Sequence, residues 1–486
     1  MMKKALLFLC LAAGLMSCAK EVLNPEKETP QNEGVPMTFN VTVLETRAAK
    51  TDWTDGDKIY VFFNGMETKY LVMTYSTGTG WSDASGGGDL LDTDFSGLGT
   101  KKLTAVHFPV AVDVTFADSK FSFTSGGKPV YNYYLFETGK DYTVDGTTVT
   151  ATLSMGKPAD MVQIHVAGIE SSVADYTFGC SKIRPVACKS VGIDGTITED
   201  VLQAGARLSG IADSDGGVFA GRLTSPGAAG DFIFTVASDD NIYTLTRTGK
   251  TLTAGTMYNF PALSVTGGTN WAVTDASGLY VDLGLSVKWA KCNLGATNPE
   301  DFGDYFAWGE LQPKNDYQWN TYLYGSDYDQ LTKYCDNASR GKDGYTDDLT
   351  VLEQSDDAAY AALGGQFRMP TQEEVYELCT IEYYHPGEYT VTWCDGTDVQ
   401  YNGTSVKGLM IVRNSTGATL FLPITGSMSG TDWYYNGFGF YLSSSLYWNN
   451  PSRALKLQLR WDSSERSYKR VDADRAGGSS IRPVRE

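Results

Sequence analysis

Residues that could support catalysis are sparse in this chain of 486 residues, which has only three histidines, His107, His165 and His385. Cys379 lies six residues before His385, and a cysteine beside a histidine can act as a nucleophile with its base. Cys379 also follows Leu378 in a segment predicted to be helical, so we favour a buried structural cysteine. His107 and His165 lie singly within apolar strands, where we expect core histidines with satisfied hydrogen bonds. The sequence predicts no catalytic residue, no cofactor and no enzymatic activity.

A metal site is not predicted either. Calcium prefers carboxylate and amide oxygens, and Trp448-Asn449-Asn450 has some similarity to a sugar-binding calcium motif. No companion carboxylate–amide–proline motif precedes it, and Pro451 follows at once. The chain also contains no CxxC pair, the usual start of a structural zinc site. Trp448, like the segment 438–441, is expected to pack in a core.

Clustered aromatic side chains offer a different chemistry, because sugar rings stack their C–H faces on exposed aromatic rings. Three consecutive aromatic residues follow the glycine-rich loop 426–430. Ligand contact and core packing both remain open for them, while the acidic residue before them could accept hydrogen bonds from hydroxyl groups. The predicted ligand-binding residues are Asp432, Trp433, Tyr434 and Tyr435.

The first residues predict export. A basic start, Met1–Lys4, precedes an apolar run that is too short to span a bilayer. Leu15-Met16-Ser17-Cys18 resembles the lipobox of bacterial lipoproteins, in which the cysteine becomes the acylated N-terminus. We therefore predict a signal peptide over 1–17, palmitate on Cys18 and a polar tether over 18–35. The predicted location is the outer membrane, as a surface lipoprotein or part of a fimbrium, because several acyl chains anchor a protein stably.

The charge balance excludes two classes of partner. Lys and Arg number 39 against 58 Asp and Glu, a net charge of −19. Nucleic-acid binding relies on basic residues that neutralise phosphate, so we expect no nucleic-acid partner. A basic patch that docks on anionic lipid is disfavoured for the same reason.

Alternating apolar residues predict strands from residue 36 to about 265. Met37, Phe39, Val41 and Val43 fall on one face of a half-buried strand. The segments 231–237 and 242–246 alternate in the same way and are joined by a polar turn. No helical pattern of ordinary length competes, so the N-terminal half is predicted to be mostly β, in two β-sandwich subdomains over 36–148 and 149–266.

The composition changes after a short linker, and residues 267–486 are predicted to form a third, α+β domain. One helix is expected after Thr371, a good N-cap with Glu373 and Glu374 in the first turn. A second short helix is expected from Asp356 to Leu363, ended by two glycines. Long loops and strands should form the rest of this domain.

Two motifs in the N-terminal half resemble those of fimbrillins, the lipoprotein precursors of Bacteroides-type pilus subunits. They are Trp53-Thr-Asp-Gly-Asp-Lys-Ile-Tyr-Val-Phe62 and Leu252-Thr-Ala-Gly-Thr-Met-Tyr-Asn-Phe260. The resemblance implies two transthyretin-like sandwich subdomains. It also implies partners, namely other pilus subunits joined by strand addition.

The C-terminal half resembles the major paralogous domain of exported Bacteroides-type and fibrobacterial proteins, which has a C-type-lectin-like fold. The matching segments occur in the expected order. They are 280–290, 292–296, 303–310, 364–371 and 481–484. The resemblance implies that residues 267–486 are a C-type-lectin-like domain that binds a glycan or a host or bacterial surface protein.

Arg47 and Ala48 lie in a polar segment just after the first predicted strand. In the pilins that the chain resembles, an Arg-directed protease cuts near this place, and the vacated groove accepts a strand from a neighbouring subunit. An ordinary exposed arginine is the alternative interpretation of Arg47. A shaft subunit of such a fibre must donate a strand to its neighbour. Here the predicted lectin-like domain follows Phe260 directly and its motifs end at Val484, so we expect a subunit that accepts a strand without donating one, namely a pilus tip adhesin. The alternative function is a surface glycan-binding lipoprotein outside any pilus.

Overall fold

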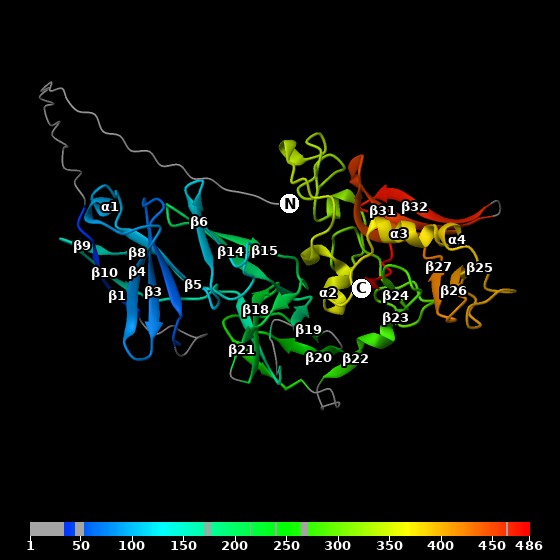
Figure 1. The fold of residues 1–486 in the computed structure, drawn as a ribbon, viewed down its shortest axis with the longest axis horizontal. Helices are drawn as coiled ribbons and strands as arrows, with labels where there is room; N and C mark the ends of the chain where they lie inside the picture. Colours follow the sequence, from blue (N-terminus) through cyan, green and yellow to red (C-terminus); the bar gives the residue numbers. More distant parts are fainter. Residues whose placement is uncertain are drawn as a thin grey trace, which may run out of the picture.

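The computed structural model describes residues 34–43, 53–169, 173, 176–213, 215–238, 241–263, 271–462 and 465–486. Over these residues the protein is mostly β, with many antiparallel sheets, as predicted. The first strands and the last part of the chain lie at opposite ends of the molecule, with the green strands β18–β22 between them (Figure 1). In the described residues no helix is long and apolar enough to cross a membrane.

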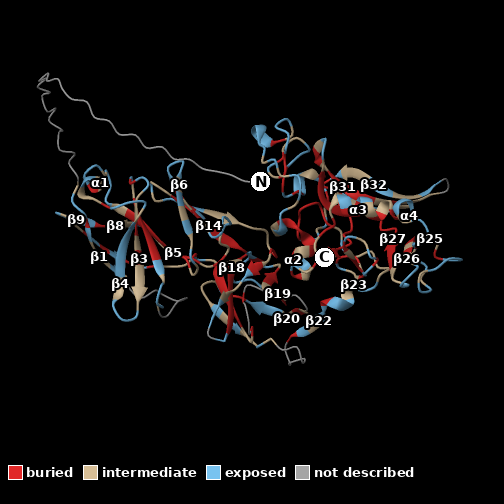
Figure 2. Cartoon of the chain, viewed as in Figure 1, coloured by how far each residue is buried: buried red, intermediate tan, exposed pale blue. Residues whose placement is uncertain are grey.

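The first part of the chain contains three sheets. Figure 2 shows the buried residues of the molecule gathered along such strands. The first sheet is β1 (Thr38–Val43), β10 (Thr148–Leu153) and β9 (Thr143–Asp145). The second is β4 (Gly80–Gly86), β3 (Tyr70–Ser76), β2 (Lys58–Phe63), β5 (Lys102–His107) and β8 (Leu135–Asp141). The third is β15 (Ile197–Val201), β14 (Val186–Gly192), β7 (Lys120–Thr124) and β6 (Asp113–Ala117), and a short helix, α1 (Asp92–Ser96), follows β4.

Strand β2 explains how these sheets pack. Successive side chains of a strand point to opposite faces. Ile59, Val61 and Phe63 contact the apolar cluster that includes β1 and β10, whereas Tyr60 and Phe62 contact the cluster that includes β7 and β14. Both faces of the strand are therefore covered by apolar side chains. Every β2 residue after Lys58 is buried for this reason.

Strand β1 confirms the alternation expected from the sequence. Met37, Phe39, Val41 and Val43 all pack on the same apolar cluster. The strand lies at the edge of its sheet and pairs in parallel with β10, from Thr38 opposite Thr148 to Val43 opposite Leu153. Among the described strands, β1 therefore forms strand hydrogen bonds along one side, the side that faces β10.

The middle of the chain forms two further sheets around a core rich in phenylalanine. One is β13 (Ile183–Arg184), β18 (Gly216–Leu223), β11 (Met161–Ala167) and β21 (Met257–Phe260), with β17 (Ile211–Ala212) also on β18. The other is β16 (Leu208–Ser209), β12 (Thr177–Cys180), β19 (Ala229–Ala237), β20 (Asn241–Thr251) and β22 (Ala272–Asp275). The predicted pairing of segments 231–237 and 242–246 is confirmed, because they lie in the antiparallel strands β19 and β20.

Two pairings link segments that are far apart in the sequence. Strand β7 pairs with β14, so one sheet contains strands from both sides of residue 149. Strand β22, which follows the predicted linker, pairs with β20 from Ala272 to Asp275 and forms the edge of that sheet. The domain boundaries themselves remain predictions.

The C-terminal part is built from small sheets and long loops. Its strands are β23 (Tyr280–Val281), β24 (Lys288–Ala290) and β33 (Val484–Arg485); β25 (Tyr389–Cys394), β26 (Gly408–Arg413) and β27 (Thr419–Pro423); β28 (Ser427–Ser429) and β29 (Asp432–Tyr434); and β30 (Phe438–Tyr447), β31 (Asn450–Trp461) and β32 (Arg466–Asp474). Its α-helices are α2 (Ala358–Leu363), α3 (Gln372–Cys379) and α4 (Ile381–Tyr384).

Both helix predictions for this part are confirmed. Thr371 caps α3 by accepting a hydrogen bond from the Glu374 backbone N–H, and the Glu374 carboxylate accepts one from the Thr371 backbone N–H, which completes a capping box. Asp357 caps α2 by accepting a hydrogen bond from the Tyr360 backbone N–H, and Gly364 ends the helix at a φ of 73°. Helix α3 packs across β31 and β32, as Figure 1 shows.

Polar contacts hold the C-terminal part against the middle sheets. Gln203 Nε2 lies 2.8 Å from both the Gly309 carbonyl and Asp356 Oδ1, while its Oε1 accepts from the Leu311 N–H at 3.2 Å. Arg207 is half-buried and donates to the Thr177 carbonyl and, from another nitrogen, to the Ala361 carbonyl. We call the contacts of Gln203 and Arg207 the junction. They cross from one part of the chain to the other at several points.

Candidate functional site

The predicted aromatic residues lie on a short hairpin made by β28 and β29. Met428 lies directly opposite Trp433, and Ser429 opposite Asp432. Gly430, at a φ of 59°, lies in the turn between the strands. Gly426 has no room for a side chain, because a Cβ there would lie 2.8 Å from Trp433 Nε1. The glycines of this loop therefore let the backbone approach the tryptophan closely.

Trp433 and Tyr435 form an exposed aromatic stack. Their ring centroids lie 5.2 Å apart at an interplanar angle of 26°, and the Tyr435 ring also stacks on Phe302 at 6.3 Å. Trp433 is 47% exposed and Tyr435 39% exposed. We call Phe302, Trp433 and Tyr435 the aromatic surface. Its exposure favours ligand contact over core packing for these side chains.

One edge of the Trp433 ring is fixed by hydrogen bonds. Its Nε1 donates to the Tyr305 hydroxyl at 2.9 Å and to the Thr425 carbonyl at 3.0 Å. Tyr305 in turn donates to the Thr425 carbonyl at 2.5 Å. The indole is thus held in place although nearly half of it is exposed.

Asp432 and Tyr434 lie on the same hairpin but do not join the stack. Both are exposed, and strand alternation directs them away from the face that carries Trp433. A sugar on the aromatic surface would thus meet Tyr435 and Phe302 beside Trp433, instead of Tyr434. Sequence reasoning missed Phe302, because it lies more than a hundred residues before the hairpin.

A cavity of about 510 Å³ adjoins the hairpin. Met428, directly opposite Trp433 in the hairpin, lines it. Other lining residues are Trp319, Asp327, Phe440, Lys456 and Asp474. We call it the Lys456 cavity. Hydroxyl, amide, carboxylate and aromatic groups share its wall, a mixture suited to a polar ring-shaped ligand.

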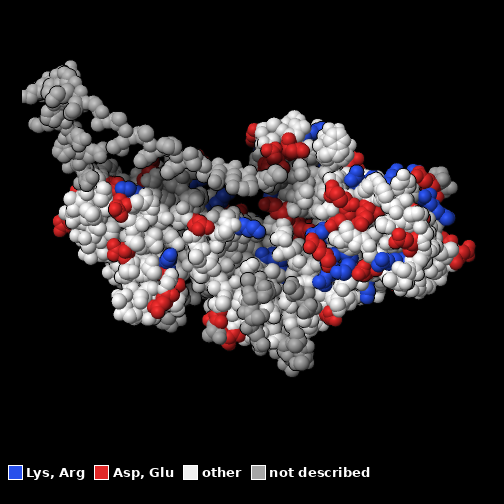
Figure 3. All heavy atoms as spheres, viewed as in Figure 1, with Lys and Arg blue, Asp and Glu red and all other residues white. Residues whose placement is uncertain are grey.

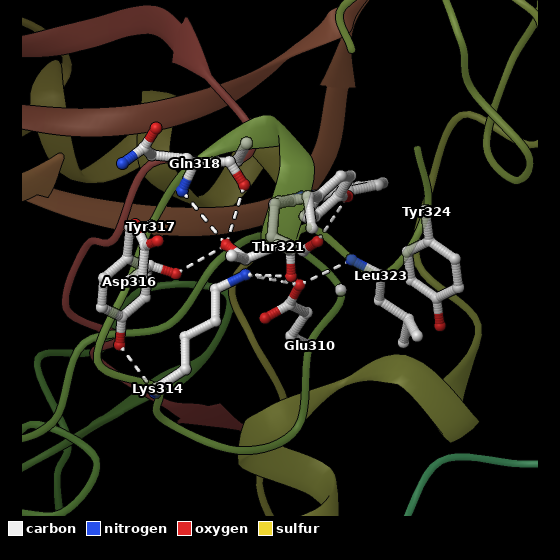
Figure 4. Close-up of polar contacts among 12 residues, drawn as sticks. Glu310, Lys314, Asp316, Tyr317, Gln318, Thr321, Leu323 and Tyr324 are labelled. Atoms are coloured by element: carbon white, nitrogen blue, oxygen red, sulfur yellow. Dashed lines mark hydrogen bonds and ion pairs between the residues drawn. The ribbon is translucent and has the colours of Figure 1, made fainter. Parts of the chain in front are cut away.

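The wall of this cavity is held by the loop shown in Figure 4. Lys314 Nζ donates to Glu310 Oε1 and to the Thr321 carbonyl, each at 2.9 Å. The same Glu310 oxygen accepts from the Leu323 N–H at 2.8 Å. This pairing fixes both ends of the segment that carries Trp319.

Lys456 is the charged group inside the cavity wall. Its side chain lies on β31, is 3% exposed, and donates to the Asp474 carbonyl at 3.0 Å and to Ser479 Oγ at 3.2 Å. Burial lowers the pKa of this amine to about 8. The Asp474 carboxylate accepts from Trp319 Nε1 and from the Ala476 N–H. It is therefore engaged with the loop on the other side of the cavity.

The histidines are isolated from one another. His107 is buried, with Nδ1 2.8 Å from the Lys58 carbonyl oxygen, and His165 Nε2 lies 3.0 Å from Asp215.

Burial raises the pKa of the Cys379 thiol to about 12, which opposes thiolate formation and a nucleophilic role.

The described part of the chain has neither a cluster of metal ligands nor a disulfide. No group of three or more His, Cys, Asp and Glu residues there could hold a metal ion. The described cysteines are free thiols. They are Cys180, Cys188, Cys292, Cys335, Cys379 and Cys394.

The prediction that Trp448 packs in a core is wrong. The residue is 74% exposed, at the tip of the hairpin between β30 and β31. Tyr441, predicted with it, is buried. The two differ because Tyr441 lies mid-strand beneath other segments, whereas a hairpin tip has nothing above it.

Three predicted residues lie outside the described part of the chain. They are Cys18, Arg47 and Ala48. The described strand β1 ends at Val43, shortly before Arg47. Lipidation and processing at these residues remain predictions.

Charge is unevenly distributed over the face in Figure 3. Acidic and basic side chains gather over the C-terminal part, while the opposite end of the molecule shows few of either sign. The chain thus presents no extended basic surface on this face.

No family model matches the chain, and no curated protein sequence matches it. Among solved structures it is similar to a fimbrial protein from Bacteroides ovatus, at 11% identity and a TM-score of 0.24, over 93% of this chain and 99% of that one. It is also similar to a candidate cell adhesion protein from the same species, at 13% identity and a TM-score of 0.25, over 50% of this chain and 96% of that one.

A third similar structure is the fimbrial anchor protein Mfa2 from Porphyromonas gingivalis, at 11% identity and a TM-score of 0.21, over 41% of this chain and 78% of that one. The chain is thus similar to fimbrial and adhesion proteins at low sequence identity. With TM-scores below 0.5, these similarities carry no argument about its activity. The proposals below therefore rest on its own residues.

Proposed function

We propose that this protein is a non-enzymatic surface adhesin that binds a glycan or a surface protein through its C-terminal part. The observation that carries the proposal is the aromatic surface. Aromatic rings that are both exposed and fixed give stacking area without the entropic cost of ordering a flexible side chain. Trp433 meets both conditions, because its Nε1 is hydrogen-bonded while the ring is 47% exposed.

The proposal includes a C-type-lectin-like fold for residues 267–486. The order of the sequence motifs supports it. The pairing of β24 with β33 also brings the two ends of this part together, as expected of a unit that folds on its own. Exposed ligand-binding loops on such a scaffold are common, because loops tolerate sequence change while the strands position them.

We also propose that the protein is a lipoprotein anchored through Cys18, and the tip subunit of a pilus assembled by strand addition. Edge strand β1 supports this, because its apolar face packs on the first sheet's cluster and its loss would open an apolar groove. The segment after β21 supports a tip position, since β22 already pairs with β20 and does not offer a free strand.

Binding is tested with a double variant, Trp433→Ala with Tyr435→Ala, against arrayed glycans and whole cells. Truncated interface aromatics often cost more than about 1 kcal/mol each, so binding should weaken at least roughly tenfold. Tyr434→Ala is the matched control, since it removes an exposed aromatic outside the stack, and it should bind normally. Normal binding by the double variant, with an unchanged melting temperature, would contradict the proposal.

Assembly is tested by sequencing the mature N-terminus from cells. A chain that begins at Ala48 supports processing at Arg47 and pilus entry. A chain that begins at Cys18 supports the non-pilus lipoprotein instead. Immunogold labelling along fibre shafts would contradict the tip position.

A further inference from the structure

The buried amine of Lys456 has fewer hydrogen-bond acceptors than it has N–H donors. The side chain is 3% exposed, and its two hydrogen-bond acceptors, the Asp474 carbonyl and Ser479 Oγ, are both neutral. An ammonium has three donors, so one remains for another group. Within the described residues, no carboxylate lies within ion-pair distance of this amine, and the nearby Asp474 carboxylate attracts it without direct contact.

A buried charge without a counter-charge is costly, and proteins usually pair it. Lys456 lies in the wall of a cavity of about 510 Å³, large enough for a sugar residue. The burial that lowers its pKa leaves the amine mostly protonated at pH 7. An anionic group that entered the cavity would supply both the third acceptor and a negative charge in direct contact with the amine, which Asp474 does not provide.

The cavity and the aromatic surface share one hairpin. Met428 lines the cavity, and its cross-strand neighbour Trp433 belongs to the aromatic surface. Directly opposite residues of a strand pair have Cβ atoms about 5 Å apart. A ligand of two or more sugar residues is thus long enough to reach both.

We propose that the Lys456 cavity binds the carboxylate or sulfate group of an acidic saccharide, while a neighbouring sugar residue of the same ligand stacks on the aromatic surface. This inference rests on the proposed glycan-binding function and specifies its ligand class. Lys456 supplies the charge, and Trp319 and Phe440 supply apolar walls.

The acidic character of the protein does not oppose this assignment. The net charge of −19 acts over distances at which physiological salt screens it, because the Debye length there is about 8 Å. Contacts made by a buried amine are screened much less. Asp327 and Asp474, which also line the cavity, already accept hydrogen bonds from protein N–H groups, so the free donor of Lys456 decides the preference once the ligand has entered.

The experiment measures binding to immobilised oligosaccharides in matched pairs. A uronate-containing, a sialylated and a sulfated oligosaccharide are each compared with a neutral parent. The wild-type chain should bind at least one acidic member about tenfold more tightly than its parent. Lys456→Gln should reduce that ratio to about one.

Lys469→Gln is the matched control, because it removes the same charge from an exposed site on the neighbouring strand β32. It should keep the full preference. If Lys456→Gln fails to fold, Lys456→Arg retains the charge and should keep the preference. Retention of the preference by Lys456→Gln, its loss in Lys456→Arg when that variant is folded, or no preference in the wild type would overturn the inference.

The outcome separates this inference from the function on which it rests. Loss of all glycan binding in the Trp433→Ala, Tyr435→Ala variant supports the adhesin function, whatever Lys456→Gln does. An unchanged acidic preference in Lys456→Gln overturns only the ligand class. Absence of any saccharide binding by the wild type overturns this inference and the glycan-binding form of the proposed function, and leaves binding of a surface protein, which the whole-cell assay tests.

Discussion

Strands β2 and β31 both have two covered faces, but the faces are covered differently. In β2 both faces are apolar, with Val61 in one cluster and Phe62 in another. In β31 Leu457 and Leu459 face an apolar cluster, whereas the other face carries the buried polar residues Ser452 and Lys456. An apolar face needs only matching volume, but a polar face needs particular partners. Where those partners are incomplete, as at Lys456, the fold leaves a cavity.

The largest effect is expected on the apolar strand. Phe62 is 2% exposed and its ring centroid lies 4.6 Å from that of Phe121. Phe62→Ala should lower the free energy of unfolding by about 3–5 kcal/mol. Phe62→Leu, which keeps most of the volume, should cost less than half as much. Urea titration of both variants measures this, and equal losses would contradict the volume argument.

A conservative change should also be costly at a buried polar side chain. Arg475 is fully buried and donates to the carbonyls of Lys333, Tyr334 and Pro451 at 2.7–2.9 Å. Lysine cannot reproduce this planar set of donors, so Arg475→Lys should cost about 3 kcal/mol. Arg470→Lys, at an exposed position, should cost almost nothing. Calorimetry of the two variants compares them, and similar melting temperatures would refute the expectation.

The pH dependence of stability distinguishes the strands further. The folded pKa of Lys456, about 8, lies below the value of about 10.4 for an unfolded lysine. Between these values the unfolded chain binds more protons, so stability should rise with pH, by about 3 kcal/mol in total. Asp474 and Arg453 act on the same amine, the first raising and the second lowering its pKa.

Lys456→Met should remove this rise, because methionine has no proton to lose. The free energy of unfolding from urea titrations between pH 7 and 10.5 provides the measurement. Lys469→Met serves as the control and should keep the rise. A rise that persists in Lys456→Met belongs to other groups.

The smallest effect is expected at the junction. Gln203→Ala removes contacts to Gly309, Leu311 and Asp356, at a cost of about 1–2 kcal/mol. Gln400→Ala, at an exposed glutamine, is the control. Scanning calorimetry should show the unfolding of the C-terminal part separating from that of the middle sheets in Gln203→Ala alone. Unchanged transitions would show that the junction contributes little.

Local patterns predicted the elements that depend on neighbouring residues. The alternation of Phe39, Val41 and Val43 and the helix cap at Thr371 were both confirmed, since the physics that sets them acts over a few residues. Lys456 shows the limit. It alternates with Leu455 and Leu457, a pattern that predicts an exposed face.

Lys456 is buried because distant segments cover that face, including Trp319 and Ser479. Phe302 was missed for a related reason, since only the folded chain brings it to Trp433 and Tyr435. Trp448 was wrongly placed in a core because aromatic character does not reveal whether a strand continues or turns. The candidate site therefore required contacts that no local pattern encodes.

The junction also determines how a mechanical load would travel. A pull on a ligand held at the aromatic surface would reach the middle sheets through Gln203 and Arg207 as well as through the connecting chain at β22. Bonds loaded side by side share a force, whereas bonds loaded one after another each carry all of it. The C-terminal part would thus resist separation from the middle sheets under a shear force. It would also keep its orientation relative to those sheets while the ligand is attached.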